Sequence, residues 1–447
     1  HGLATQESVA KLYDELDFQR GVQSYLWALP IVAMAQARIA QTKNTGAGDG
    51  DVGIYDGFDN VSVWLTANAT TPYIIGFFDL SVDGPAVLDI PAGAIAGSAM
   101  DFWQRPFTDF GITGPDQGKG GKYLVVGPDQ EVPEQDGYIV VHSPTNNFGY
   151  FYRALDSDPA KAEAIATGVK AYSFASRDNP RETRYLRPPA DKTLELTIQP
   201  RGMAYWTELA AILDKEPVED RDRFFLAMLR PLGIEKGKPF APDERQTRIL
   251  TEAAQIGEEM AKVTSFDKRF AGARYREDSH WDYLLMLDPA QDLPDFSQLD
   301  ERAAYFYEAV ATSKGMVSTT PGVGQAYLGS YRDKDGHAFD GSATYRLRVP
   351  ADAPAKDFWS LTVYDLDTRA LIQNTEKVAD RSSRMDLRRN DDGSVDLFVA
   401  PQAPEGWEQN WIPSVPGRSW FAYARLYGPT EGYFDKSWPL PDFEKIE

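Results

Sequence analysis

The sequence predicts an α+β fold in three successive parts, because the spacing of its apolar residues changes along the chain. Residues 5–42 carry apolar side chains mostly three or four positions apart, which is the spacing of helices. Residues 61–153 form short apolar runs between turn residues, residues 159–311 are mostly helical in pattern, and alternation returns after residue 313. We therefore expect a mixed α/β N-terminal domain at 1–190, a helical segment at 191–312 and an antiparallel, jelly-roll-like β-sandwich domain at 313–447.

The helical start of the chain contains its most apolar stretch, residues 25–35. This stretch is shorter than the ~20 apolar residues that a membrane-spanning helix needs. Pro30 also interrupts it. We expect a buried helix with a kink at the proline, and no membrane span.

The alternating segments predict individual strands. In the N-terminal domain these are 61–65, 73–80, 86–90, 123–126 and 138–142. In the C-terminal domain they are 343–349, 358–364, 395–399 and 420–426.

Composition narrows the classes of function. The chain has 447 residues and a formal net charge of -21, which argues against nucleic-acid partners because these require clustered Lys and Arg. It has no cysteine, which excludes thiolate metal sites, iron–sulfur clusters and a cysteine nucleophile. The 4 histidines are far apart in sequence and no standard cofactor or nucleophile motif occurs, so we expect no metal and no cofactor.

The start of the chain bears on its location. The first residue is His1 rather than Met, which indicates that a leader or a tag has been removed. Together with the absence of cysteine, this favours a periplasmic or secreted protein.

Short motifs occur in both halves of the chain. In the first half they are Asn68–Tyr73, Phe78–Leu80, Pro85–Pro91, Gly120–Pro128 and Ser143–Asn146. In the second half they are Asp335–Gly336, Phe358–Asp365, Asp392–Ser394, Asn410–Pro413 and Arg425–Tyr427. With these motifs the chain resembles two-domain bacterial proteins of the domain-of-unknown-function families 1254 (N-terminal) and 1214 (C-terminal). The resemblance implies a mixed α/β first domain and a β-sandwich-like second domain, and it implies no established reaction.

Polar residues at the ends of the predicted N-terminal strands form the candidate site. Histidine side chains are common proton-transfer groups, so His142 is a candidate catalytic base if hydrolysis or elimination occurs, and Asp79 is the other candidate. Amide and hydroxyl groups beside aromatic rings suit a sugar, an aromatic acid or another carboxylic acid. The candidate ligand-binding residues are Asn68, Thr71, Tyr73, Lys122, Thr145, Asn146 and Arg153.

Two arginines interrupt aromatic runs. Arg153 follows Phe148–Tyr152, and Arg425 follows Phe421–Ala424. An arginine in such a place pairs with a structural carboxylate or with a ligand carboxylate, and the sequence leaves both alternatives open. For Arg425 and Asn410 we expect a role in holding the fold rather than in catalysis.

Two interpretations of function remain. In the first, the chain is an extracytoplasmic small-molecule binding protein, and a cofactor-independent hydrolase or lyase if it catalyses a reaction. Its site would lie in the N-terminal half, with the C-terminal domain forming at most one wall. In the second, the chain is a non-catalytic interaction or structural protein of the cell envelope, whose motifs maintain the fold and a homo-oligomer interface.

Overall fold

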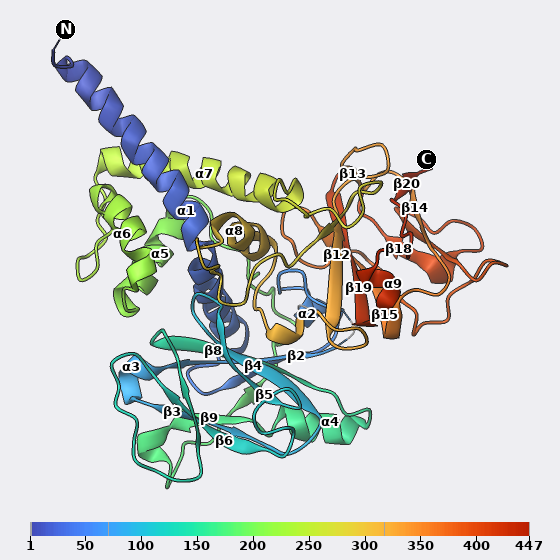
Figure 1. Ribbon diagram of the computed structural model, residues 1–447, viewed down its shortest axis with the longest axis horizontal. Helices are drawn as coiled ribbons and strands as arrows, with labels where there is room; N and C mark the ends of the chain where they lie inside the picture. Colours follow the sequence, from blue (N-terminus) through green and yellow to red (C-terminus); the bar gives the residue numbers. More distant parts are fainter. Residues whose placement is uncertain (1, 70, 317, 447) are drawn as a thin grey trace.

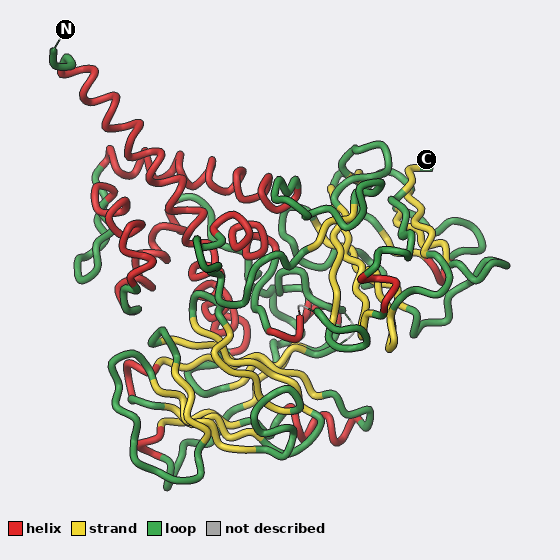
Figure 2. Tube along the Cα trace, in the orientation of Figure 1, coloured by secondary structure: helices red, strands yellow, loops and turns green. Residues whose placement is uncertain are grey.

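The computed structural model describes residues 2–69, 71–316 and 318–446. Figure 1 shows a helical layer, a strand-rich part that holds most of the N-terminal strands, and a β-rich part that contains the C-terminus. The long helices gather in one region, whereas the strands and some short helices lie in the other two (Figure 2). The α+β prediction is therefore confirmed. His1 and Thr70, which belong to sequence features discussed above, lie outside the described residues.

The N-terminal helix α1 (Gln6–Thr45) is one helix of 40 residues. Thr5 caps its start by accepting a hydrogen bond of 3.1 Å from the backbone N–H of Ser8, and Gly46 ends it with a φ of 77°. Pro30 lies within the helix in its buried middle section. In the described part of the chain, no helix combines the length and the apolarity that crossing a membrane requires.

Helix α1 is the centre of the helical layer. The helices that pack against it are α5 (Met203–Lys215), α6 (Arg223–Leu229), α7 (Glu244–Phe266) and α8 (Leu299–Glu308). Helices α1 and α7 come close where Gly257 faces Tyr25, since a Cβ added to Gly257 would lie 2.6 Å from the tyrosine ring. The other α-helices of the described residues are α2 (Phe58–Val61), α3 (Leu80–Asp83), α4 (Pro159–Ala166) and α9 (Glu431–Phe434).

Two sheets form the N-terminal strand-rich part. Sheet A has the order β10 (Tyr185–Leu186), β1 (Val52–Tyr55), β2 (Tyr73–Asp79), β8 (Asn147–Ala154), β4 (Ile95–Asp101) and β5 (Pro106–Gly111). Sheet B has the order β7 (Ile139–His142), β6 (Gly121–Val126), β3 (Ala86–Ile90) and β9 (Lys170–Ser173). One face of sheet A shares a core with sheet B, and residues of its other face, such as Ile75 and Phe77, join the core of the helical layer.

Two further sheets form the C-terminal part. Sheet C has the order β11 (Trp281–Tyr283), β12 (Gln325–Ser330), β19 (Ser419–Pro429), β15 (Ala355–Asp365) and β16 (Asp380–Ser382), and β13 (Phe339–Asp340) also pairs with β19. Sheet D has the order β18 (Trp411–Pro413), β17 (Val395–Ala400), β14 (Tyr345–Val349) and β20 (Glu444–Lys445). Neighbouring strands are antiparallel except for β17 and β18, so the predicted antiparallel architecture of this part is confirmed.

Several predicted strands match and one is wrong. The prediction for 86–90 coincides with β3, and the predictions for 73–80 and 395–399 differ from β2 and β17 by one residue. Residues 61–65 form no strand: α2 ends at Val61 and turns follow, although the apolar run is buried. Periodicity alone does not identify the structure of a short apolar run that is buried on all sides. Strand β11 lies within the segment that was predicted to be mostly helical.

Candidate functional site

Strand β19 presents two chemically different faces, because successive side chains of a strand point to opposite sides. Trp420 points toward sheet D, where it stacks on Phe339 at 4.0 Å and meets the edge of Tyr345 at 5.4 Å between ring centroids. The opposite face carries Phe421, Tyr423, Arg425 and Tyr427. This face points toward the helical layer, since Phe421 packs on Phe266 of α7 at 5.3 Å.

The polar and aromatic face of sheet C closes a cavity of about 510 Å³ between the N-terminal and C-terminal parts. Sheet A and the loop before β2 form the N-terminal wall, and the loop after α8 contributes Ala309–Ser313. The polar and aromatic lining residues used below are Trp64, Thr66, Asn68, Tyr73, Arg153, Tyr305, Tyr327, Tyr423, Arg425 and Tyr427. This volume is within the ~300–1,000 Å³ of typical small-molecule sites.

Arg425 is 4% exposed and is held by neutral groups. Its Nη1 donates to the hydroxyl of Thr362 at 3.0 Å, and its Nη2 donates to the backbone carbonyl of Thr66 at 2.9 Å. The second bond joins the C-terminal part to the N-terminal part, as expected of a residue that holds the fold. The same side chain also lines the cavity.

Arg153 reaches the cavity from β8 of sheet A. Its guanidinium lies 4.5 Å from the centre of the Tyr73 ring and donates to the hydroxyl of Thr71. The negative face of an aromatic ring attracts a cation without neutralising it. The positive charge of Arg153 is therefore still available to a ligand.

Both guanidinium groups are close enough to three shared tyrosines to be influenced by them. Burial lowers the pKa of each arginine, but neighbouring tyrosines outweigh burial, and both pKa values lie above the ordinary value. The tyrosines that act on both arginines are Tyr73, Tyr327 and Tyr427. Arg153 and Arg425 therefore remain charged cations close to one shared group of rings.

Neither guanidinium forms an ion pair with a carboxylate of residues 2–69, 71–316 and 318–446. The acidic residues of the lining are the half-buried Asp109 and the exposed Asp357. Asp380 is buried near Arg425, and Arg425 lowers its pKa, although burial is the larger effect and raises that pKa. Buried charges are normally paired, yet the buried Arg425 and the half-buried Arg153 have no carboxylate at ion-pair distance among the described residues.

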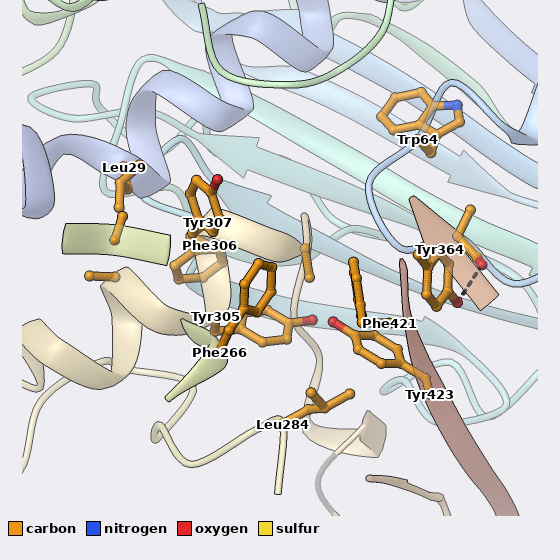
Figure 3. Close-up of a cluster of buried hydrophobic side chains, with 14 of the residues drawn as sticks. Leu29, Trp64, Phe266, Leu284, Tyr305, Phe306, Tyr307, Tyr364, Phe421 and Tyr423 are labelled. Atoms are coloured by element: carbon orange, nitrogen blue, oxygen red, sulfur yellow. Dashed lines mark hydrogen bonds between the residues drawn. The ribbon is translucent and has the colours of Figure 1, made fainter. Parts of the chain in front are cut away.

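Two of the lining residues, Tyr305 and Tyr423, belong to a cluster of buried aromatic side chains. Figure 3 shows Tyr305, Phe306 and Tyr307 of α8 in one cluster with Tyr364, Phe421 and Tyr423 of sheet C. The hydroxyl of Tyr364 donates to the carbonyl of Ala67 at 2.8 Å. This contact fixes the loop that carries Thr66 and Asn68 against sheet C.

The structure brings some of the sequence-predicted residues to the cavity. Asn68, Tyr73 and Arg153 line it, and Thr71 contacts Arg153. Asn68 donates from its side chain to the hydroxyl of Tyr427, and from its backbone N–H to the hydroxyl of Tyr73 at 2.8 Å. His142, Asp79, Lys122, Thr145 and Asn146 are not among the lining residues.

Asp79, Thr145 and Asn146 make contacts that organise the backbone. Asp79 caps α3 by accepting a hydrogen bond of 3.0 Å from the backbone N–H of Ser81. Thr145 is fully buried and donates to the carbonyl of Asn147 at 2.6 Å. The backbone N–H of Asn146 donates to the carboxylate of Glu216 at 2.6 Å, which links the turn before β8 to the end of α5.

His142 and Lys122 are exposed in sheet B. Lys122 Nζ lies 4.0 Å from the carboxylate of Asp89. These two residues are separated from the cavity, because sheet B packs on the face of sheet A opposite to the one that carries Arg153.

The C-terminal residues of the cavity were not among the predicted site residues. Tyr327, Tyr423 and Tyr427 line it together with Arg425, so sheet C supplies as much of the charged lining as sheet A. The signal in the sequence is the alternation in Phe421, Tyr423, Arg425 and Tyr427, which places an arginine among aromatic residues on one face of a strand.

Comparisons with known proteins identify the families of both parts. Residues 55–175 match the family model described as protein of unknown function (DUF1254). Residues 324–431 match the model described as protein of unknown function (DUF1214). A search of the curated proteins found no match.

Two solved structures are similar to this chain. The VPA0106 protein from Vibrio parahaemolyticus is 17% identical with a TM-score of 0.56, and the similarity covers 96% of this chain and 100% of that chain. An uncharacterized protein from Burkholderia cenocepacia is 11% identical with a TM-score of 0.43, covering 96% of this chain and 94% of the other. At 17% identity, the first of these similarities concerns the fold alone.

Proposed function

For this chain, in which a DUF1254 domain precedes a DUF1214 domain, we propose binding of a small organic carboxylate in the cavity between sheets A and C. The observation that carries the proposal is the pair of arginines, Arg153 and Arg425, which face the same tyrosines without a carboxylate at ion-pair distance among the described residues. A carboxylate accepts charge-assisted hydrogen bonds from guanidinium groups in a planar, two-point geometry.

The remaining lining supports an apolar body for this ligand. Trp64, Tyr305 and Phe151 supply aromatic surface, and Leu284 and Met316 supply aliphatic surface. Burial of an apolar group contributes about 25 cal/mol per Å² of surface removed from water. Of the ligand classes that the sequence suggests, aromatic and branched aliphatic acids therefore fit better than sugars.

The proposal concerns binding, and an extracytoplasmic location is part of it, supported by the cysteine-free composition. Hydrolase or lyase activity would require a base within reach of the ligand. His142 and Asp79 do not line this cavity, so they are not assigned to a reaction there.

The test compares matched acids and amides. Thermal unfolding and isothermal titration calorimetry would be measured with 3-phenylpropionate, 4-methylpentanoate, the two corresponding amides and glucose. A ligand of the folded state stabilises it by about 2.7 kcal/mol at a concentration of 100 times Kd. We expect the acids to raise Tm and the amides and glucose to leave it unchanged. Equal stabilisation by an acid and its amide would contradict the proposal.

Variants connect the binding to the two arginines. Arg425→Gln and Arg153→Gln should each weaken binding of the acids by about 10- to 100-fold, because hydrogen bonds to charged groups are worth about 1.5–3 kcal/mol. Arg388→Gln is the matched control, since Arg388 stacks on Trp407 at 4.2 Å and is not a lining residue. If Arg388→Gln weakens binding of the acids to the same extent, the loss of binding in the other two variants does not come from the cavity.

A second candidate function, assembly of a homo-oligomer, is supported by α1. Its N-terminal section exposes Leu12 by 64%, Tyr13 by 60% and Leu16 by 39%. Positions 12 and 16 are one helical turn apart and lie on one face. This section projects beyond the helical layer in Figure 1, where it is accessible to another molecule.

A further inference from the structure

Two tyrosine hydroxyls at the cavity are held by one residue, Asn68. The hydroxyl oxygen of Tyr427 accepts a hydrogen bond from the side-chain amide of Asn68, and that of Tyr73 accepts one of 2.8 Å from its backbone N–H. Both tyrosines line the cavity, Tyr73 from β2 of sheet A and Tyr427 from β19 of sheet C. Asn68 thus connects phenol groups that come from opposite walls.

Each of these hydroxyls has a proton that its bond with Asn68 does not use. A tyrosine hydroxyl both accepts and donates, and Asn68 is the donor in both bonds. Among residues 2–69, 71–316 and 318–446, no oxygen accepts a hydrogen bond from Tyr73 or Tyr427. Tyr73 is half-buried and Tyr427 is 9% exposed. Both phenols can therefore donate to a ligand in the cavity.

The neighbours of Tyr427 fix its position and its protonation. Its ring stacks on that of Phe358, with 3.9 Å between the ring centroids and 10° between the ring planes. Burial raises the pKa of the Tyr427 hydroxyl, and although Arg425 and Arg153 lower it, the pKa remains above the ordinary value. At neutral pH Tyr427 is therefore a phenol that donates, not a phenolate.

The two phenols lie close to the two arginines. The guanidinium of Arg153 is 4.5 Å from the centre of the Tyr73 ring, and Arg153 and Arg425 both act on Tyr427. An ionised carboxylate only accepts hydrogen bonds, and its two oxygens offer about four lone-pair positions. Two guanidinium groups and two phenols match this requirement.

We propose that Tyr73 and Tyr427 are ligand-binding residues, each donating a hydrogen bond from its hydroxyl to the carboxylate that Arg153 and Arg425 hold. This inference rests on the proposed function of the cavity, and it adds the uncharged donors of the carboxylate site. The head group that fits the site is the ionised acid, because a protonated acid or an amide would bring donors of its own.

Two variants remove the hydroxyls and keep the rings. Titration calorimetry with 3-phenylpropionate should show an affinity about 10- to 100-fold lower in Tyr73→Phe and in Tyr427→Phe, the range of a hydrogen bond to a charged group. Tyr185→Phe is the control and should bind like the parent. Its hydroxyl donates to the carbonyl of Val169 at 2.8 Å, and Tyr185 does not line the cavity.

Infrared spectroscopy separates a direct contact from a structural effect, because the stretching bands of a carboxylate depend on the hydrogen bonds that it accepts. The bands of bound, isotope-labelled 3-phenylpropionate would be measured at saturating concentration. We expect them to shift in Tyr73→Phe and in Tyr427→Phe relative to the parent, and to stay unchanged in Tyr185→Phe. A tyrosine that only supports the fold would change the affinity without moving the bands.

The outcomes distinguish this inference from the proposed function. If either Tyr73→Phe or Tyr427→Phe binds 3-phenylpropionate as tightly as the parent, the inference is overturned and carboxylate binding remains in place. Weaker binding with unshifted bands would also overturn it. If one of the two variants does not fold, the other decides. If the parent binds neither 3-phenylpropionate nor 4-methylpentanoate, both proposals fail.

Discussion

Arg153 of β8 and Arg425 of β19 belong to different sheets, yet both line one cavity with Tyr427 and both act to lower its pKa, which burial raises. Tyr427 also accepts a hydrogen bond from the side chain of Asn68, which belongs to the loop before β2. One tyrosine thus lies close to two cations and an amide that come from three separate segments. This arrangement concentrates charged and polar side chains at the junction of the N-terminal and C-terminal parts.

Asn410 is predicted to stabilise the C-terminal part. It is fully buried, its amide oxygen accepts from the backbone N–H of Arg388 at 2.8 Å, and its amide nitrogen donates to the carbonyls of Arg388 and Asp396. Asn410→Ala should lower the free energy of unfolding by about 1–3 kcal/mol, because it leaves buried backbone groups without partners. Urea denaturation measures this, with the exposed Asn179→Ala as control.

Binding of carboxylates should survive in Asn410→Ala, since Asn410 does not line the cavity. An Asn410→Ala protein with the stability of the parent and a lost response to acids would contradict a purely structural role.

The buried ion pair of Lys268 and Glu308 gives a second stability prediction. The two groups are 3.7 Å apart and both side chains are fully buried. Lys268→Met should lower the free energy of unfolding by about 3–5 kcal/mol, because it leaves the Glu308 carboxylate without its compensating charge. Adding Glu308→Gln should recover part of the loss, as seen in urea denaturation of the single and double variants.

The control is Lys11→Met, which removes an exposed pair with Glu7. Exposed pairs contribute about 0–1 kcal/mol. If Lys268→Met is no more destabilising than Lys11→Met, the prediction that the buried Lys268–Glu308 pair matters more for stability than an exposed pair is wrong.

Glu216 should make stability depend on pH. Burial raises its pKa from 4.5 to about 7, although it accepts hydrogen bonds from Asn147 and Asn146. The folded state therefore binds this proton more tightly than the unfolded state. The resulting stabilisation is complete below pH 4.5 and is lost as the pH rises through about 7. A shift of this size corresponds to about 3 kcal/mol.

Denaturation curves from pH 4.5 to pH 8 test this dependence in the parent and in Glu216→Gln. Glutamine does not titrate, so the stability of the variant relative to the parent should increase with pH. Glu7→Gln serves as an exposed control. If the free energies of unfolding of Glu216→Gln and the parent differ by the same amount over the whole pH range, Glu216 is not the source of the pH dependence.

Sequence patterns predicted the architecture well where side chains alternate or recur regularly. Strand β3 and the antiparallel C-terminal sheets follow from turns and alternation, which are local properties. The buried run from Val61 to Leu65 was predicted to be a strand, but turns follow the end of α2 there, and burial of the run accounts for its apolar residues without a strand.

The cavity could be predicted only in part. Arg153 and Arg425 stand out in the sequence because each interrupts an aromatic run. Which residues lie beside each arginine in the cavity depends on which strands pair. For example, β12 pairs with β19, so Tyr327 is directly opposite Arg425. Such non-local pairing is not encoded in any short motif. His142 looked favourable by its chemistry, but it lies at the exposed end of β7 in sheet B.

The alternative interpretation, a homo-oligomer, predicts a role for the exposed end of α1. Leu12→Ser combined with Leu16→Ser should reduce the mass of the particle, as measured by light scattering after size exclusion, if α1 forms the interface. Val82→Ser is the control, because Val82 is 70% exposed on α3. A parent protein that is monomeric at all concentrations, or an assembly that both variants leave intact, would exclude this interface.

A crystal structure of the protein with bound 3-phenylpropionate tests the central claim most directly. We predict the carboxylate within hydrogen-bonding distance of the guanidinium of Arg153 or Arg425, with the phenyl ring against the aromatic lining of the cavity. An acid bound at another place, or bound in the cavity with its carboxylate turned away from both arginines, would contradict the account.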